Sequence, residues 1–164
     1  GLLPAMVGKG KGHVVNISSI GVLTNAPRFL VYVASKAALD AWTCCAASEF
    51  ADQGVTFTTI NMPLVRTPMI APTPLYNNVP TLSPQEAADM VVQACIFKPA
   101  RIATRLGIVG QVLHALLPRV AQIGMNTSFR MFSETAPAKE AKEAKPPLSA
   151  EAVALQQMMR GIHF

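Results

Sequence analysis

Acidic residues are scarce in this chain of 164 residues, in which 9 aspartates and glutamates stand against 14 lysines and arginines and the net charge is +5. A positive chain binds nucleic acid when its basic residues gather in a stripe with aromatic residues between them. Here the basic residues are scattered, and aromatic residues make up only 6% of the chain. We therefore expect no nucleic-acid partner.

Cysteine is also rare. The chain has three cysteines, Cys44, Cys45 and Cys95, without the paired spacing of a metal site. His114 has no second ligand one helical turn away, so we interpret it as a packed side chain. We predict no bound metal and buried free thiols, which are typical of a reducing compartment. No signal peptide opens the chain, which also favours a cytoplasmic location.

Long hydrophobic runs are missing as well. The longest apolar stretch, residues 107–124, is interrupted by Gln111, His114 and Pro118-Arg119. Because a membrane-spanning helix needs about 20 consecutive apolar residues, this stretch does not predict a span. A helix of this kind could still lie on a membrane surface, so peripheral membrane contact is one alternative.

What the chain does contain is an alternation of strands and helices. Apolar, β-branched runs predict strands at residues 13–18, 55–61 and 101–104. Pro27 is well placed at the start of a helix that ends near residue 52. Ser83-Pro84-Gln85-Glu86 is a capping box, and it predicts a helix ending near residue 97. Such alternation predicts an α/β fold with a parallel sheet.

The remaining segments complete a division of the chain. Residues 20–28 are predicted to form a loop, and residues 107–132 have helical spacing. We assign residues 1–132 to the α/β part, residues 133–148 to a charged low-complexity linker, and residues 149–164 to a C-terminal helix.

Tyr32 and Lys36 lie four residues apart in the predicted helix and therefore share one of its faces. A tyrosine phenol is a poor acid or base near neutral pH unless a neighbouring cation stabilises its phenolate. Lys36 can supply that cation, so Tyr32 could exchange a proton at working pH. Tyr-x-x-x-Lys pairs are also common by chance, and a solvated lysine beside a half-buried tyrosine is the structural alternative.

Ser19 precedes Tyr32 by 13 residues and ends the first predicted strand. In a parallel sheet, ligands bind at the carboxyl ends of the strands. A serine at this place can hydrogen-bond the same substrate oxygen that the tyrosine protonates.

Gly12-His13-Val14-Val15-Asn16-Ile17-Ser18-Ser19, followed by Tyr32-x-x-x-Lys36, resembles the catalytic half of the short-chain dehydrogenase/reductase family. The resemblance implies that Ser19 orients a carbonyl, Tyr32 donates a proton and Lys36 holds the nicotinamide ribose. Ser18 is the weaker candidate for the serine role, because it is one residue too far from Tyr32.

The same resemblance implies a fold, namely the C-terminal half of a Rossmann-type doubly wound parallel sheet with a C-terminal helical extension. The Gly-x-x-x-Gly-x-Gly phosphate loop of the family is absent from the sequence. We therefore expect the cofactor-binding half to be missing from this chain.

Residues 62–73 are similar to a segment of bacterial fatty acyl-CoA reductases that form long-chain aldehydes, and the similarity continues through residues 17–29 and 79–84. It implies NADPH as the cofactor, with NADH not excluded, and a long-chain acyl-CoA substrate. It also implies that Pro63, Val65 and Thr67 contact the nicotinamide. Met62-Pro63 departs from the usual Pro-Gly of the wider family, so the backbone here must suit the fixed φ of proline.

An apolar, proline-rich segment from Pro68 to Leu82 has the length of a substrate lid, although an irregular connection is the equal alternative. Met69 and Tyr76 would suit an alkyl chain, and with Ser19 they are the candidate substrate-binding residues. In the resembling family the helix that carries Tyr32 and Lys36 lies in a subunit interface. We therefore expect a homo-oligomer.

Two other functions stay open on the sequence. The first is reduction of a keto group or aldehyde by the same three residues. The second is a fragment without catalysis, which would act through a partner that completes the sheet beside residues 13–18.

Overall fold

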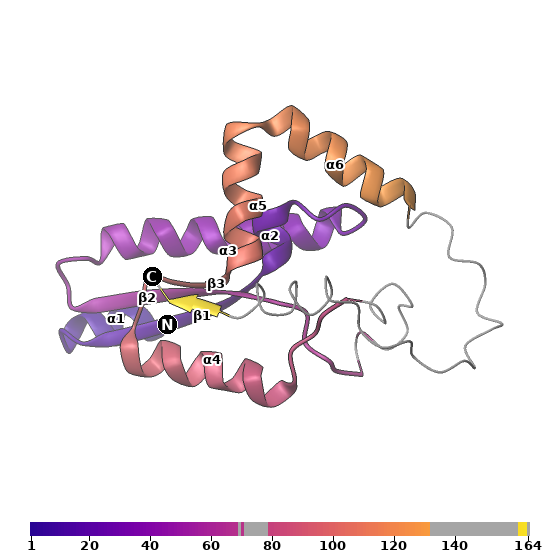
Figure 1. The fold of residues 1–164 in the computed structure, drawn as a ribbon. Coiled ribbons are helices and arrows are strands. Elements are labelled where there is room, and N and C mark those ends of the chain that lie inside the picture. The colour runs from indigo at the N-terminus through magenta and orange to yellow at the C-terminus, as the bar shows by residue number, and fades with distance from the viewer. Residues whose placement is uncertain (69, 71–78, 132–160, 164) are drawn as a thin grey trace.

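The computed structural model describes residues 1–68, 70, 79–131 and 161–163 of the chain. Its centre is a four-stranded sheet in the order β1-β2-β3-β4 (Figure 1). The first three strands are β1 (Gly12–Ser19), β2 (Val55–Met62) and β3 (Arg101–Thr104). They confirm the three strands predicted from sequence, within one residue at each end.

The three strands run parallel. β1 and β2 pair along their whole length, from Gly12 opposite Val55 to Ser19 opposite Met62. A parallel pair needs a long crossover, which α3 (Leu30–Glu49) supplies between β1 and β2 and α4 (Pro84–Phe97) supplies between β2 and β3. Because β1 and β2 end together, Ser19 and the segment after Met62 share one edge of the sheet.

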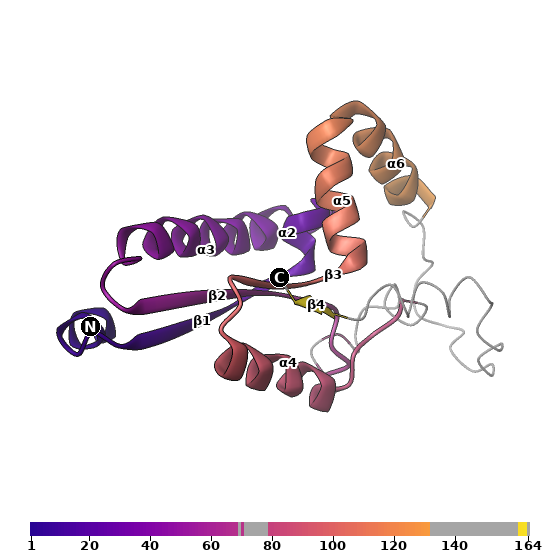
Figure 2. The same cartoon turned by 60° about the vertical axis from the view of Figure 1, so that its left-hand side comes forward.

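Helices cover both faces of the sheet, with α3 on one face and α4 on the other (Figure 2). Side chains alternate along β2, so Phe57 packs with the α3 side while Ile60 packs with the α4 side. Both faces of β2 are therefore buried, because every residue from 57 to 61 is buried. The cluster on the α4 side contains Ile60, Met90, Ala94 and Ile102, and that on the α3 side contains Ala46, Val55 and Phe57 with Leu3 and Met6 of α1 (Leu2–Gly8).

The start of α4 is the capping box predicted from sequence. The Ser83 hydroxyl accepts a hydrogen bond from the Glu86 amide at 3.2 Å, and the Glu86 carboxylate accepts one from the Ser83 amide at 2.8 Å. These two bonds satisfy amide groups that have no partner within the helix.

Residues 20–28 do not form the continuous loop that the sequence suggested. Ile20–Thr24 form the short helix α2, which begins directly after β1. The reason is local, because Ser19 caps this helix through its side chain. α2 ends at Asn25, which adopts the left-handed conformation with φ 51°.

α5 (Arg105–Leu116) and α6 (Pro118–Met131) form a helical hairpin, called the hairpin below. The sequence predicted helical structure here, and the break falls at Pro118, which has no amide hydrogen to continue α5. No helix in the described part of the chain is long and apolar enough to cross a membrane.

Two further expectations need correction. Residues 161–163 were expected in a C-terminal helix but form β4 (Gly161–His163). β4 pairs antiparallel with β3 and provides hydrogen-bond partners for the backbone groups on the outer edge of β3. All three cysteines are exposed free thiols rather than buried ones. The predicted linker at residues 133–148 and the rest of the predicted helix, residues 149–160, lie outside the described residues.

Candidate active site

Ser19 lies at the carboxyl end of β1, where the chain turns into α2. Its hydroxyl oxygen accepts a hydrogen bond from the Gly21 amide at 3.1 Å, and its side chain is partly exposed. A serine hydroxyl keeps its own proton for donation when it accepts in this way. Ser19 is therefore held in place and can still donate to a bound oxygen.

Ser18 has different surroundings. It is only 3% exposed, and its hydroxyl donates to the carbonyl oxygen of Lys36 at 3.4 Å. Its side chain is thus turned into the contact between β1 and α3. The structure separates the two serines that the sequence left adjacent, with Ser18 inside and Ser19 at the accessible edge.

Tyr32 and Lys36 lie in the first two turns of α3, as predicted. The Lys36 ammonium donates to the Ile17 carbonyl at 2.9 Å, two residues before Ser19. The same ammonium lies 6.0 Å from the centroid of the Tyr32 ring. Tyr32 is 46% exposed, so its ring is open to a ligand. This hydrogen bond, together with that from Ser18 to the Lys36 carbonyl, holds the helix of the tyrosine and lysine against the strand of the serine.

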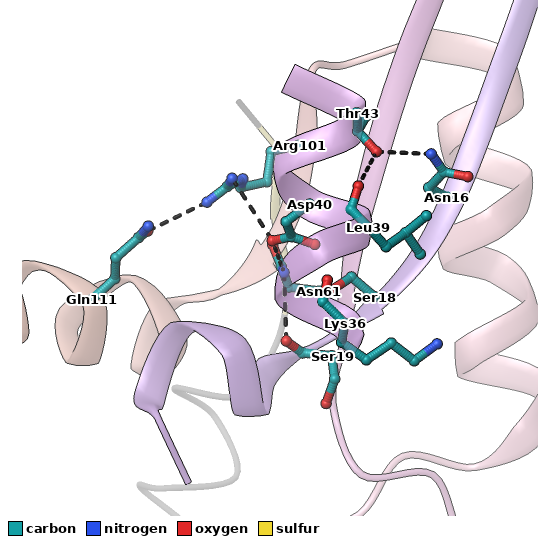
Figure 3. Close-up of polar contacts among 10 residues, drawn as sticks. All are labelled: Asn16, Ser18, Ser19, Lys36, Leu39, Asp40, Thr43, Asn61, Arg101 and Gln111. Carbon is teal, nitrogen blue, oxygen red and sulfur yellow. Dashed lines mark hydrogen bonds and ion pairs between the residues drawn. The ribbon is translucent and has the colours of Figure 1, made fainter. Parts of the chain in front are cut away.

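A buried polar group supports this contact, and the sequence analysis did not find it. Asp40 follows Lys36 by one helical turn and is only 7% exposed. The amide nitrogen of Asn61 donates to the Asp40 carboxylate at 3.0 Å and to the Ser19 carbonyl at 3.4 Å. Figure 3 shows this group, in which Arg101 approaches the same carboxylate at 4.0 Å and donates to Gln111 at 3.3 Å.

The geometry fixes how the Asn61 side chain is oriented. Both of its partners are acceptors, so the amide must present its NH₂ group to them, and both amide hydrogens are used. Asn61 is fully buried. It therefore links α3, through Asp40, to the backbone of Ser19. A hint was present in the sequence, because Asp40 is the one acidic residue in the interior of an apolar helix.

The segment after β2 returns to the same edge of the sheet. Val65 bridges Leu82, and two backbone hydrogen bonds of 2.8 Å join Arg66 to Leu82 and Leu82 to Leu64. Pro63 is buried, whereas Val65 and Thr67 are partly exposed. Met69 and Tyr76, the predicted substrate-binding residues, lie outside the described residues.

His13 is a titratable group at the opposite end of β1. Its ring nitrogens bond the hydroxyls of Thr56 at 2.7 Å and Thr58 at 3.2 Å. Burial lowers the pKa of His13 below its ordinary value, and the nearby Lys98 lowers it further. Since His13 and Ser19 lie six residues apart on an extended strand, roughly 20 Å separates them. His13 is therefore not part of the candidate site.

Comparison with known proteins agrees with this geometry. Residues 1–76 match the family model described as short chain dehydrogenase. A fatty acyl-CoA reductase of Acinetobacter baylyi is 53% identical over 131 residues, which are 80% of this chain and 44% of that protein. The chain belongs to the short-chain dehydrogenase family. The resemblance to bacterial fatty acyl-CoA reductases, expected from residues 62–73, is thereby confirmed.

A second relative and a solved structure also match. An uncharacterized oxidoreductase of Mycobacterium tuberculosis is 40% identical over 164 residues, covering 99% of this chain and 48% of that protein. The crystal structure of a short-chain dehydrogenase from Streptomyces avermitilis has a TM-score of 0.59 at 24% identity, covering 79% of this chain and 56% of that one. This likeness confirms the fold class. The chain spans less than half the length of the curated relatives it matches.

Proposed function

We propose that this chain provides the catalytic half of an NADPH-dependent reductase that converts a long-chain acyl-CoA to an aldehyde. The observation that carries the proposal is the hydrogen bond from Lys36 to Ile17, because it holds the helix of Tyr32 and Lys36 beside the end of the strand that carries Ser19. The similarity to the Acinetobacter baylyi fatty acyl-CoA reductase supports the substrate class.

The residues present fit the nicotinamide end of such a cofactor. The Lys36 ammonium has three N–H groups, and among the described residues one donates to Ile17, so two are available for ribose hydroxyls. Pro63, Val65 and Thr67 follow β2 at the same edge and would lie against the nicotinamide. When bound, the cofactor supplies a hydride to the carbonyl carbon. The chain contains no glycine-rich phosphate loop, so the choice of NADPH over NADH rests on the family resemblance alone.

In the proposed mechanism, Ser19 donates a hydrogen bond to the thioester carbonyl oxygen and fixes its direction. Tyr32 gives its phenolic proton to that oxygen as the carbon becomes tetrahedral, and the Lys36 ammonium stabilises the resulting phenolate. The carbon–sulfur bond then breaks, Tyr32 recovers the proton, and coenzyme A leaves as the aldehyde forms. These three side chains would lower the activation barrier by orienting the carbonyl group as well as by stabilising charge.

The test joins residues 1–164 to the part of the Acinetobacter baylyi reductase that they do not cover. We expect NADPH-dependent release of free coenzyme A, measured with a thiol reagent alongside NADPH oxidation. Tyr32→Phe should lower kcat by about a thousandfold, because it removes the proton donor but keeps the ring. Ser19→Ala should lower kcat about a hundredfold.

Ser18→Ala is the matched control, and it should keep most of the turnover, because Ser18 is buried against α3. Unchanged turnover in Tyr32→Phe would refute the proposed mechanism. Aldehyde or ketone reduction without release of coenzyme A would favour the alternative reductase. The chain alone should bind little NADPH, and micromolar binding by it would contradict that expectation.

Two properties accompany the proposal. The exposed residues Leu30 and Val31, 81% and 84% exposed at the start of α3, support a homo-oligomer formed through this helix. The three free thiols support a cytoplasmic location. Light scattering of the chain and of Leu30→Lys would test the first of these.

A further inference from the structure

The hairpin packs on the rest of the protein through glycines. A Cβ at Gly107 would lie 2.9 Å from a methyl group of Leu23, and a Cβ at Gly110 would lie 3.2 Å from the methyl group of Thr24. Gly107 and Gly110 are three residues apart and therefore share one face of α5. This face is in close contact with α2, so it is the inner face of the hairpin.

The outer face of α5 carries large apolar side chains. Val109, Val112, Leu113 and Leu116 are spaced at 3, 4 and 7 residues, which places them in one stripe. They are 55%, 49%, 39% and 73% exposed. Amphipathic helices normally bury such a stripe, but here the glycines face the protein and the apolar stripe faces away from it.

Exposed apolar side chains are also present in the turn after α5 and on α6. Leu117, Val120 and Ile123 are 53%, 55% and 67% exposed. In Figures 1 and 2, α5 rises away from the sheet and α6 extends beyond the layer of α3. Exposed apolar side chains gathered on two neighbouring helices are typical of an interaction site.

The charge of the hairpin identifies the kind of partner. Residues 105–131 contain three arginines, Arg105, Arg119 and Arg130, and no aspartate or glutamate. A second copy of the hairpin would bring the same arginines without a carboxylate to pair with them. An anionic lipid surface offers both an apolar phase and negative charge. Helices of 12 and 14 residues are too short to span the bilayer, so they would lie in its interface.

We propose that the hairpin docks the protein on the surface of a bilayer containing anionic lipids, with the α5 stripe and the exposed apolar side chains of α6 inserted among the acyl chains. This proposal is independent of the reductase function, and the chain of residues 1–164 is sufficient to test it.

The test is co-sedimentation of the chain with vesicles of phosphatidylcholine alone and with vesicles that also contain phosphatidylglycerol. We expect binding to the second kind, weakened by added salt. The paired substitution Val112→Ser and Leu116→Ser should lower the partition coefficient by about tenfold or more. Arg105→Gln and Arg119→Gln should each lower it about fivefold on the anionic vesicles only.

The matched control is Val92→Ser with Ile96→Ser on α4, where the two side chains have the same spacing and are 53% and 64% exposed. This variant should bind vesicles as the unchanged chain does. Far-ultraviolet circular dichroism checks that each variant is folded, and the arginine variants carry the test if the apolar variant is not.

Three outcomes would overturn the proposal. They are absence of binding to the anionic vesicles by the unchanged chain, equal loss of binding in the α4 control, and binding of both arginine variants to the anionic vesicles as strong as that of the unchanged chain. Conversion of a dimer to a monomer by the Val112 and Leu116 substitutions, without vesicle binding by the unchanged chain, would assign the surface to a second copy instead.

Discussion

Asn61 is the residue on which the arrangement of the candidate site depends most directly. Its amide is shared between the Asp40 carboxylate on α3 and the Ser19 carbonyl at the end of β1. It joins these two elements from a third one, β2. One further oxygen of Asp40 and the amide oxygen of Asn61 are buried without a partner among the described residues, so the network has no spare donors.

We predict that Asn61→Leu lowers the free energy of unfolding by about 3 kcal/mol, because it leaves a buried carboxylate without its closest donor. Asp40→Asn is the control. It keeps an oxygen acceptor for Asn61 and should cost less, about 1 kcal/mol. Urea unfolding of the two variants measures both values. Equal losses would mean that charge, rather than the missing donor, determines the cost.

At the scale of residues, the sequence predicted members of the candidate site only where they follow a known spacing. Ser19, Tyr32 and Lys36 lie within 18 residues and repeat a known spacing. Asp40, Asn61 and Arg101 lie on three different elements, and only the folded sheet brings them together. The difference between Ser18 and Ser19 also needed the structure, because it depends on which side chain turns toward α3.

At the scale of elements, the strands and α4 were predictable because their signals are local. The capping box of α4 and the β-branched run of β2 lie within the elements themselves. α2 was missed because Ser19 serves two elements at once, as the last residue of β1 and the cap of α2. β4 was missed because its partner, β3, lies about 60 residues earlier in the chain.

Two glycines give a matched test of how turns and helices use this residue. Gly54 has φ +69°, and a Cβ there would collide with the backbone oxygen of Gly10. Gly124 lies in α6, and no atom of the described residues beyond the adjacent helix backbone lies within 4 Å of its Cβ position. We predict that Gly54→Ala lowers the free energy of unfolding by more than about 1 kcal/mol, whereas Gly124→Ala raises it by about 0.5 to 1 kcal/mol.

Thermal or urea unfolding of the two alanine variants measures these changes. If both variants raise the free energy of unfolding, the turn before β2 can move away from Gly10. The hydrogen bond from the Gly12 amide to the Gly54 carbonyl argues against such a movement.

At the scale of the whole molecule, His13 makes stability depend on pH. Burial lowers its pKa in the folded state below the ordinary value of 6.5. As the pH falls below 6.5, the unfolded chain therefore binds a proton that the folded chain still excludes, and the free energy of unfolding falls. Above 6.5, the histidine is neutral in both states and makes no such difference.

We predict that His13→Gln reduces this decline, because glutamine can also bond the two threonines but does not titrate in this range. Urea unfolding at a series of pH values, for the chain and the variant, gives the comparison. If the free energy of unfolding falls equally steeply with decreasing pH in both proteins, a group other than His13 controls the acid sensitivity.

The bridge between Val65 and Leu82 has a consequence for redesign. It joins the two ends of the intervening segment to each other, and the free-energy cost of closing a loop rises only slowly with its length. Residues between Thr67 and Leu82 can therefore be exchanged, shortened or extended as a cassette. If the proposed function holds, variants with different preferences for acyl-chain length could be built this way while Ser19 on β1 and Tyr32 and Lys36 on α3 are left untouched.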